Sequence, residues 1–257
     1  RMNETLEAMA RAIFKDWFVD FGPTRAKAEG RKPYLAPDLW SLFPDRFGDN
    51  GLPGGWEMQP LLEAARLISG GTPKTDNLEY WNGDIPWASA KDVSQCGALF
   101  LTRSERNITK SGLENSSTKI VPALATVVVA RGATTGRYCM FGQDMAMNQT
   151  CYALTSKNTP VVLHLAFGTI VGRLVNAAHG SVFDTITTTT LQGVSVVNPG
   201  AALLQRCEQS VRPLYDRALA NSKESETLAA LRDLLLPKLM SGEIRIRDAE
   251  KTVGEVL

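Results

Sequence analysis

The feature that most constrains the fold is a seven-residue periodicity near the carboxyl end of the chain. The pattern predicts a helix from about Gly200 to Leu236, roughly 55 Å long, with Pro237 ending it. Small and apolar side chains recur on two interleaved series and form the seam of a coiled coil. The seam residues are Leu204, Cys207, Val211, Leu214, Ala218, Asn221, Ser225, Leu228 and Leu235. One small domain is too short to cover such a stripe, so we expect a second helix, from another chain, to pack on it.

The amino-terminal segment predicts a second amphipathic helix. From Asn3 to Phe21 apolar side chains fall at helical spacing, and Gly22-Pro23 is expected to stop the helix. Within it, Glu4-Thr5-Leu6 recurs near the other end of the chain as Glu226-Thr227-Leu228, and later apolar positions agree at the same offset. Chance agreement is an open alternative, because amphipathic helices draw on a limited set of residues. The repeat otherwise indicates one unit of a duplicated architecture.

Between these helices the chain predicts a linker and one mixed domain. Residues 23–56 are basic and then rich in proline and glycine, which is typical of a linker that lies over a surface. Residues 57–199 alternate short apolar runs with turn signals, and a buried helix is expected from Pro160 to Val175, with Thr159 as its N-cap. The run Thr185–Thr190 is interpreted mainly as strand. The expected fold class is α+β, with an N-terminal helix in residues 1–22, a long helix in residues 200–237 and a tail in residues 238–257.

Composition limits the function without identifying it. The chain has 257 residues and a formal net charge of +1, so it is large enough to bury a core and is not basic overall. Its four cysteines are widely spaced and only two histidines accompany them, so we expect no zinc site and reduced thiols, as in the cytoplasm. We recognise no signal peptide at its start, and Pro160–Val175 is too short to span a bilayer, so no membrane partner is expected.

One unusual string of residues carries a family resemblance. It comprises Ser69–Thr75 (SGGTPKT), then Tyr80–Trp87 (YWNGDIPW) and Lys91-Asp92. Together with Leu52–Glu57, Ala130–Arg137 and both terminal helices, it resembles the target-recognition domains and repeated regions of Type I restriction-modification specificity subunits. That resemblance covers nearly the whole chain and implies a globular domain that reads one half of a bipartite DNA site. Such subunits usually carry two recognition domains and this chain has room for one, so it is a natural half-subunit or an excised C-terminal half.

The resemblance also implies partners. Double-stranded DNA is the expected ligand, and methyltransferase and restriction subunits are expected to supply methylation and cleavage. The chain itself is expected to be non-catalytic and to need no cofactor, because it lacks a D/E-x-K nuclease core, a P-loop and a methyl-donor loop. A half-subunit is expected to form an antiparallel homodimer through the long helix and to read an interrupted palindrome. The alternatives are a coiled-coil assembly scaffold whose globular domain binds protein, and a hydrolase with an unrecognised site.

The candidate DNA contacts fall on four segments. In the first motif, glycines permit close backbone approach to phosphate, while lysine and threonine side chains bind it; a plain turn before a hairpin is an equally open interpretation. Two arginines bracket a Gly-rich and Thr-rich loop and are suited to bind guanine, although an ordinary exposed hairpin is the alternative. Tyr80, Trp81 and Trp87 are expected to pack rather than to stack on bases. The candidates are Gly71, Thr72, Lys74, Thr75, Lys91, Arg131, Thr134, Thr135, Arg137, His179 and Ser181.

Overall fold

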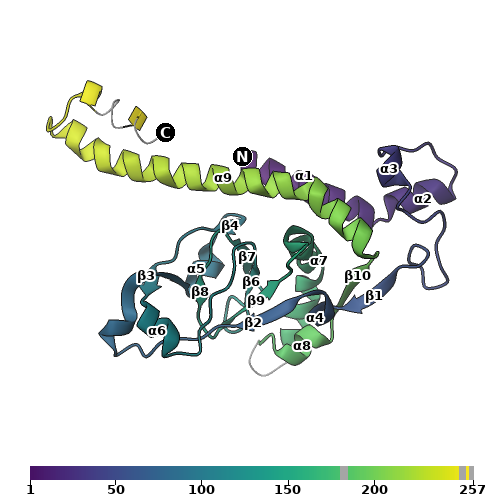
Figure 1. Cartoon of the computed structure of the whole chain (residues 1–257), viewed down its shortest axis with the longest axis horizontal. Coiled ribbons are helices and arrows are strands. Elements are labelled where there is room, and N and C mark those ends of the chain that lie inside the picture. Colours follow the sequence, from purple (N-terminus) through teal and green to yellow (C-terminus); the bar gives the residue numbers. More distant parts are fainter. Residues whose placement is uncertain (180–184, 249–252, 255–257) are drawn as a thin grey trace.

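A computed structural model describes residues 1–179, 185–248 and 253–254 (Figure 1). The helices are α1 (Met2–Phe18), α2 (Gly22–Ala28), α3 (Pro37–Trp40), α4 (Leu61–Ala64), α5 (Ala90–Gln95), α6 (Lys110–Glu114), α7 (Pro160–His179), α8 (Thr188–Gln192) and α9 (Ala201–Met240), with a 3-10 turn at Leu78–Tyr80. The strands are β1 (Glu57–Pro60), β2 (Arg66–Ser69), β3 (Trp81–Ala88), β4 (Phe100–Leu101), β5 (Arg106–Ile108), β6 (Thr126–Val129), β7 (Tyr138–Phe141), β8 (Ala146–Met147), β9 (Cys151–Thr155) and β10 (Ser195–Asn198). The predicted mixed fold with a long C-terminal helix is confirmed.

The globular part is built around a five-stranded sheet in the order β2-β9-β6-β7-β4. Its central strand β6 is buried along its whole length, because both faces of the sheet are covered. On one face Val128 packs in a cluster with Phe167 of α7, and on the other Val127 packs with Val93 of α5. Burial on both faces explains why this strand is a continuous apolar run. A second sheet, β5-β3-β8, and a two-stranded sheet, β1-β10, lie on opposite sides of it (Figure 1).

α7 is the apolar helix expected from the sequence, and it begins at Pro160 as predicted. It runs beyond the predicted end at Val175 to His179, so the expectation that it is too short for a bilayer is wrong: Pro160–Ala178 could cross a membrane by length and composition alone. Half of this stretch is buried inside the protein, as in the core helix of a globular fold. Such a helix is therefore weak support for a membrane span.

The first half of α9 is covered within this chain, which corrects the expectation that another chain must cover the whole seam. α1 lies against α9 and runs antiparallel to it (Figure 1). Asn3, at the start of α1, donates from Nδ2 to the Ala218 carbonyl oxygen at 3.0 Å, and Asn221 donates to Asn3 Oδ1 at 2.9 Å. The α9 side chains that are buried in one cluster with Phe14 and Trp17 of α1 are Leu203, Cys207, Val211, Tyr215 and Ala218.

The distal half of α9, residues 223–240, is more exposed. Leu228 has 42% and Leu234 has 54% of its surface exposed, whereas Leu235 has only 9%. One contact ties this half to the globular part, because Glu226 accepts hydrogen bonds from Thr102 and, at 3.1 Å, from Arg103 Nε. The distal half therefore presents apolar side chains that α1 does not reach.

Three further expectations change. Pro237 lies inside α9 rather than at its end, since a proline removes one helical hydrogen bond and the flanking bonds are enough to continue the helix. The predicted strand Thr185–Thr190 is wrong: Thr187 forms a capping box with Thr190 that starts α8. Residues 23–56 were expected to be a surface linker. They form most of α2 and all of α3, and Phe43 and Trp56 are buried in the same cluster as Phe14 and Trp17 of α1.

Candidate nucleic-acid interface

Three loops meet at one edge of the five-stranded sheet. Ser69 at the end of β2 lies opposite Tyr152 near the start of β9. Val129 at the end of β6 lies opposite Cys151, and β7 starts at this edge because it runs antiparallel to β6. We term this the loop edge; it comprises residues 70–77, 130–137 and 148–150. The structure thereby brings together the candidates of the first motif and the candidates around the two arginines.

The paired glycines of the first loop serve internal packing. A Cβ atom on Gly70 would collide with the Asn148 carbonyl oxygen. Gly71 is buried, donates its N–H to the Met147 carbonyl oxygen at 2.9 Å and accepts at its own carbonyl from Trp87 Nε1 at 3.0 Å. The close approach that these glycines permit is therefore to the protein's own backbone. This corrects the expectation that Gly71 leaves room for a phosphate, because both of its backbone polar groups are used.

Lys74 and Thr75 lie exposed further along the same loop. Within the described residues the Lys74 ammonium makes no ion pair, while the Lys74 carbonyl accepts from Trp81 Nε1 at 3.1 Å. Trp81 is buried, which confirms the expectation that it packs rather than lying open for stacking. Thr72 donates to Gln149 Oε1 in the turn between β8 and β9, so two loops of the edge are joined. The loop backbone is thus fixed while the Lys74 side chain remains available.

Arg131 and Arg137 are both exposed at the two ends of the β6–β7 loop. Among the residues that the structure describes, neither guanidinium makes an ion pair. Arg131 lies opposite Thr185 in an isolated antiparallel bridge, and Ile186 donates its N–H to the Ala130 carbonyl oxygen at 2.8 Å. Thr185 and Ile186 therefore lie beside this loop.

The shape of the β6–β7 loop depends on its glycines. Gly132 and Gly136 have φ angles of 94° and 88°, in the region that side chains other than glycine rarely adopt. A Cβ atom on Gly136 would also collide with the side chain of Val175 in α7. Thr135 donates from Oγ1 to the Gly132 carbonyl oxygen at 2.7 Å, whereas Thr134 is exposed. These contacts hold the loop between the two arginines in one conformation.

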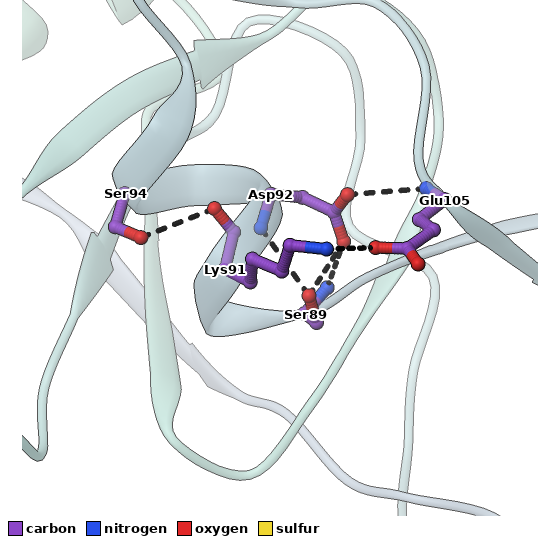
Figure 2. A network of polar contacts seen from close by, with 5 residues as sticks. All are labelled: Ser89, Lys91, Asp92, Ser94 and Glu105. Atoms are coloured by element: carbon purple, nitrogen blue, oxygen red, sulfur yellow. Dashed lines mark hydrogen bonds and ion pairs between the residues drawn. The ribbon is translucent and has the colours of Figure 1, made fainter.

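Lys91 lies in a local network at the start of α5 (Figure 2). Ser89 and Asp92 form a capping box, and Asp92 also accepts from the backbone N–H of Glu105 at 3.1 Å. The Lys91 ammonium lies 2.8 Å from the Glu105 carboxylate, and this hydrogen bond and charge raise the pKa of Lys91. Its charge is already partly neutralised, so Lys91 is a weaker candidate for phosphate than Lys74.

The remaining candidates are His179, in α7, and Ser181. His179 is the last residue of that helix, and Ser181 lies outside the described residues. His179 and Ser181 therefore stay predictions.

A buried histidine of α7 packs against the five-stranded sheet. His164 of α7 is 3% exposed, and its Nδ1 lies 3.1 Å from Thr126 Oγ1. Its ring centroid is 5.3 Å from that of Tyr138 in β7 and 6.0 Å from that of Tyr215 in α9. Burial, and then the charge of Arg11 in α1, lower the pKa of His164 to about 3. The ring is therefore neutral at physiological pH and belongs to the core.

Sequence reasoning missed two exposed residues of this region. Gln149 lies in the turn beside Thr72, and its only sequence signal was its position just before a strand. The Arg106 guanidinium lies 3.5 Å from the centroid of the Trp81 ring. No local pattern indicates that contact, because the two residues lie on different strands.

The fold defines a class of module in which a mixed sheet domain is attached to a long helix paired with a shorter one. The same fold occurs in the crystal structure of the Type-I restriction-modification system S subunit from M. genitalium, with a TM-score of 0.52 and 15% sequence identity over 93% of this chain and 56% of that chain. The chain belongs to the family of the Type I restriction modification DNA specificity domain, whose sequence model matches residues 53–199. The resemblance inferred from the motifs is confirmed.

The relatives that this chain matches are named as Type I restriction enzyme specificity subunits. The HindI specificity subunit of Haemophilus influenzae is 27% identical over 291 residues, which cover 95% of this chain and 63% of that protein. The MjaIX specificity subunit of Methanocaldococcus jannaschii is 26% identical over 181 residues, 69% of this chain and 41% of that protein. The EcoR124I/EcoR124II specificity subunit of Escherichia coli is 38% identical over 81 residues, 31% of this chain and 19% of that protein. The chain thus spans less than two thirds of the length of these relatives.

Proposed function

We propose that this chain is the DNA-recognition component of a Type I restriction-modification system and reads one half of a bipartite site through its loop edge. One observation carries the proposal: Lys74, Arg131 and Arg137 are exposed cations on neighbouring loops, and none has an ion-pair partner within the described residues. Membership of the DNA specificity family supports DNA as the ligand. A chain with a net charge of +1 can bind DNA in this way because three exposed cations without ion pairs lie on neighbouring loops at one edge.

The side chains of the loop edge divide into two roles. Lys74 and the hydroxyls of the first loop suit phosphate oxygens, which fix the position of a protein on DNA without reading sequence. Arg131 and Arg137 suit base edges in the major groove, where a guanidinium donates two hydrogen bonds to one guanine. The proposed contacts are Thr72, Lys74, Thr75, Arg131, Thr134, Thr135 and Arg137, with Lys91, His179 and Ser181 at the margin.

The proposal assigns no catalytic step to this chain. Methyltransferase subunits would transfer the methyl group and restriction subunits would cleave, and the chain would position both on DNA in the cytoplasm. The free thiols of Cys96, Cys139, Cys151 and Cys207 are compatible with that reducing compartment. A preparation of the chain alone is expected to show no methyl transfer, nicking or ATP hydrolysis, and robust activity from it would contradict the assignment.

Binding to mixed DNA duplexes, with and without a methyltransferase subunit, tests the proposal. The logarithm of the affinity should fall linearly with the logarithm of the salt concentration, by about 0.9 per neutralised phosphate. Methylome sequencing of a host that carries the chain and its methyltransferase would then identify the site. Absence of binding even with the methyltransferase subunit would contradict DNA recognition and favour the alternative, a scaffold whose globular part binds protein.

We further propose that two copies form a homodimer through the distal half of α9 when no second recognition domain is present. The exposure of Leu228 and Leu234 supports this surface, and the cover of α1 over the first half of the seam removes that half from it. An antiparallel pair would carry its globular parts at opposite ends and read an interrupted palindrome. Light scattering should find a dimer that the double variant Leu228→Lys/Leu234→Lys converts to a monomer. A strict monomer for the unmodified chain would refute the pairing.

A further inference from the structure

Two tryptophans lie directly beneath the first loop of the edge. Trp81 and Trp87 are each 5% exposed, and their rings meet edge to face with centroids 5.2 Å apart. Both belong to β3, which lies in the middle of the three-stranded sheet. The pair forms a rigid apolar platform, because buried aromatic rings in contact have little rotational freedom.

The indole N–H groups of this platform bind the loop above it at two points. Trp87 Nε1 donates to the Gly71 carbonyl oxygen at 3.0 Å, and Trp81 Nε1 donates to the Lys74 carbonyl oxygen at 3.1 Å. Gly71 is also fixed by its N–H bond to the Met147 carbonyl oxygen at 2.9 Å. The backbone on which Lys74 stands is therefore held before any ligand arrives.

The face of the Trp81 ring contacts the cationic side chain of Arg106. The Arg106 guanidinium lies 3.5 Å from the Trp81 ring centroid and 5.9 Å from that of Trp87. A guanidinium is planar and weakly hydrated, so it stacks on an aromatic face while its N–H groups stay free to donate. Arg106 is exposed and, like Lys74, has no ion-pair partner in the part of the chain that the structure describes.

We propose that Trp81 is a positioning residue that organises a two-cation phosphate site made by Lys74 and Arg106. The Trp81 indole donates its N–H to the Lys74 backbone, and its ring face packs against the Arg106 guanidinium. Trp81 thus fixes the backbone of one cation, Lys74, and the guanidinium of the other, Arg106. Neither has an ion-pair partner within the described residues, and charge-assisted hydrogen bonds to a phosphate would satisfy both. The inference rests on the proposed DNA recognition and adds Arg106 to the DNA-contacting residues.

Two measurements on the full chain test this site. DNA binding over a range of salt concentrations compares the unmodified protein with Lys74→Gln, Arg106→Gln and Trp81→Phe. Each cation variant should lower the salt slope, and the two together should lower it by about 0.9, the contribution of the one phosphate that they share. Trp81→Phe keeps a ring but loses the N–H donor, and it should weaken binding about two- to tenfold, as expected for one lost hydrogen bond. Its effect should not add to that of Lys74→Gln, because it acts through the same contact.

Hydrogen exchange without DNA provides the second measurement. In Trp81→Phe the amides of residues 72–77 should exchange faster than in the unmodified protein, because the loop has lost one of the two indole hydrogen bonds that hold it. Trp56→Phe is the matched control, since Trp56 is a buried indole in the cluster below α1. Lys157→Gln is the matched cation control, because Lys157 follows β9 at the opposite edge of the sheet and is exposed. Both controls should leave loop exchange and salt slope unchanged.

The outcomes separate this inference from the proposed function. If the unmodified protein binds no DNA, the recognition proposal fails, and faster loop exchange in Trp81→Phe still supports the positioning role. If DNA binds but Arg106→Gln leaves the salt slope unchanged, the two-cation site is overturned. Unchanged loop exchange in Trp81→Phe, or an effect that adds fully to that of Lys74→Gln, overturns the positioning role.

Discussion

Glu208 of α9 should be worth more to stability than any other carboxylate near it, because it caps α7. Glu208 is only 7% exposed, and its carboxylate accepts hydrogen bonds from the backbone N–H groups of Val161 at 3.3 Å and Val162 at 2.9 Å. These donors belong to the first turn of α7, where backbone N–H groups have no partner within the helix. A negative charge there also interacts favourably with the positive end of the helix dipole.

The magnitude follows from the groups that Glu208→Ala leaves behind. A hydrogen bond to a charged group contributes about 1.5–3 kcal/mol, and two buried donors would lose their acceptor. Part of this is offset because the carboxylate itself is costly to bury, and that burial raises the pKa of Glu208. We expect a net loss of about 2–3 kcal/mol in the free energy of unfolding. Glu208→Gln retains one acceptor oxygen and should lose about 1 kcal/mol.

Urea unfolding at neutral pH measures both variants. Asp216→Ala is the matched control. Like Glu208, which lies 3.9 Å from Arg212, Asp216 forms an ion pair with Arg212, at 2.7 Å, but it is exposed. That variant should change the free energy of unfolding by less than about 0.5 kcal/mol. The capping argument would be refuted by a Glu208→Ala protein whose stability lies within about 0.5 kcal/mol of the unmodified protein.

Three other predictions concern DNA contact, pH and spacing. Arg131→Ala and Arg137→Ala should each weaken specific binding by about 1–3 kcal/mol and relax the choice at one base pair; unchanged methylation sites and affinity in both would remove them from the interface. Folding lowers the pKa of His164 from 6.5 to about 3, so its contribution is complete above pH 6.5 and is lost as the pH falls. Denaturant titrations should show about 2 kcal/mol less stability at pH 5 than at pH 7 from this group, and an identical pH dependence in His164→Gln would contradict it. In a dimer, one heptad inserted after Leu231 should widen the gap between half-sites by about 10 Å, or about three base pairs; a folded, active variant with an unaltered gap would refute the spacing.

The insertion point illustrates how the structure refines an argument from the sequence. Periodicity alone allows a heptad anywhere in the long helix. Glu226, however, binds Thr102 and Arg103 of the globular part, so an insertion before it would separate the spacer from the domain that it carries. A position beyond Glu226 keeps that contact and lengthens only the surface proposed for pairing.

The sequence by itself determined the local structure and the family. The seven-residue pattern predicted α9, the apolar run beginning at Pro160 predicted α7, and the string around Ser69–Thr75 identified the specificity family. Each of these depends on residues close together in the chain, where side-chain period and motif spacing are directly visible. The strand predicted for Thr185–Thr190 was wrong, because a capping box starts a helix there and outweighs the strand preference of threonine.

Only the tertiary structure decided which surfaces meet. Burial of apolar area is not directional, so the seam of α9 required a covering helix without specifying which one; α1 of the same chain covers its first half, and Asn3 pairs with Asn221. The same reason applies at the loop edge. Tryptophans of strand β3 donate hydrogen bonds to the carbonyls of Gly71 and Lys74, and one of them packs its ring against Arg106. Those contacts join segments that are separate in the chain, and they depend on how the sheets pack rather than on any pattern along it.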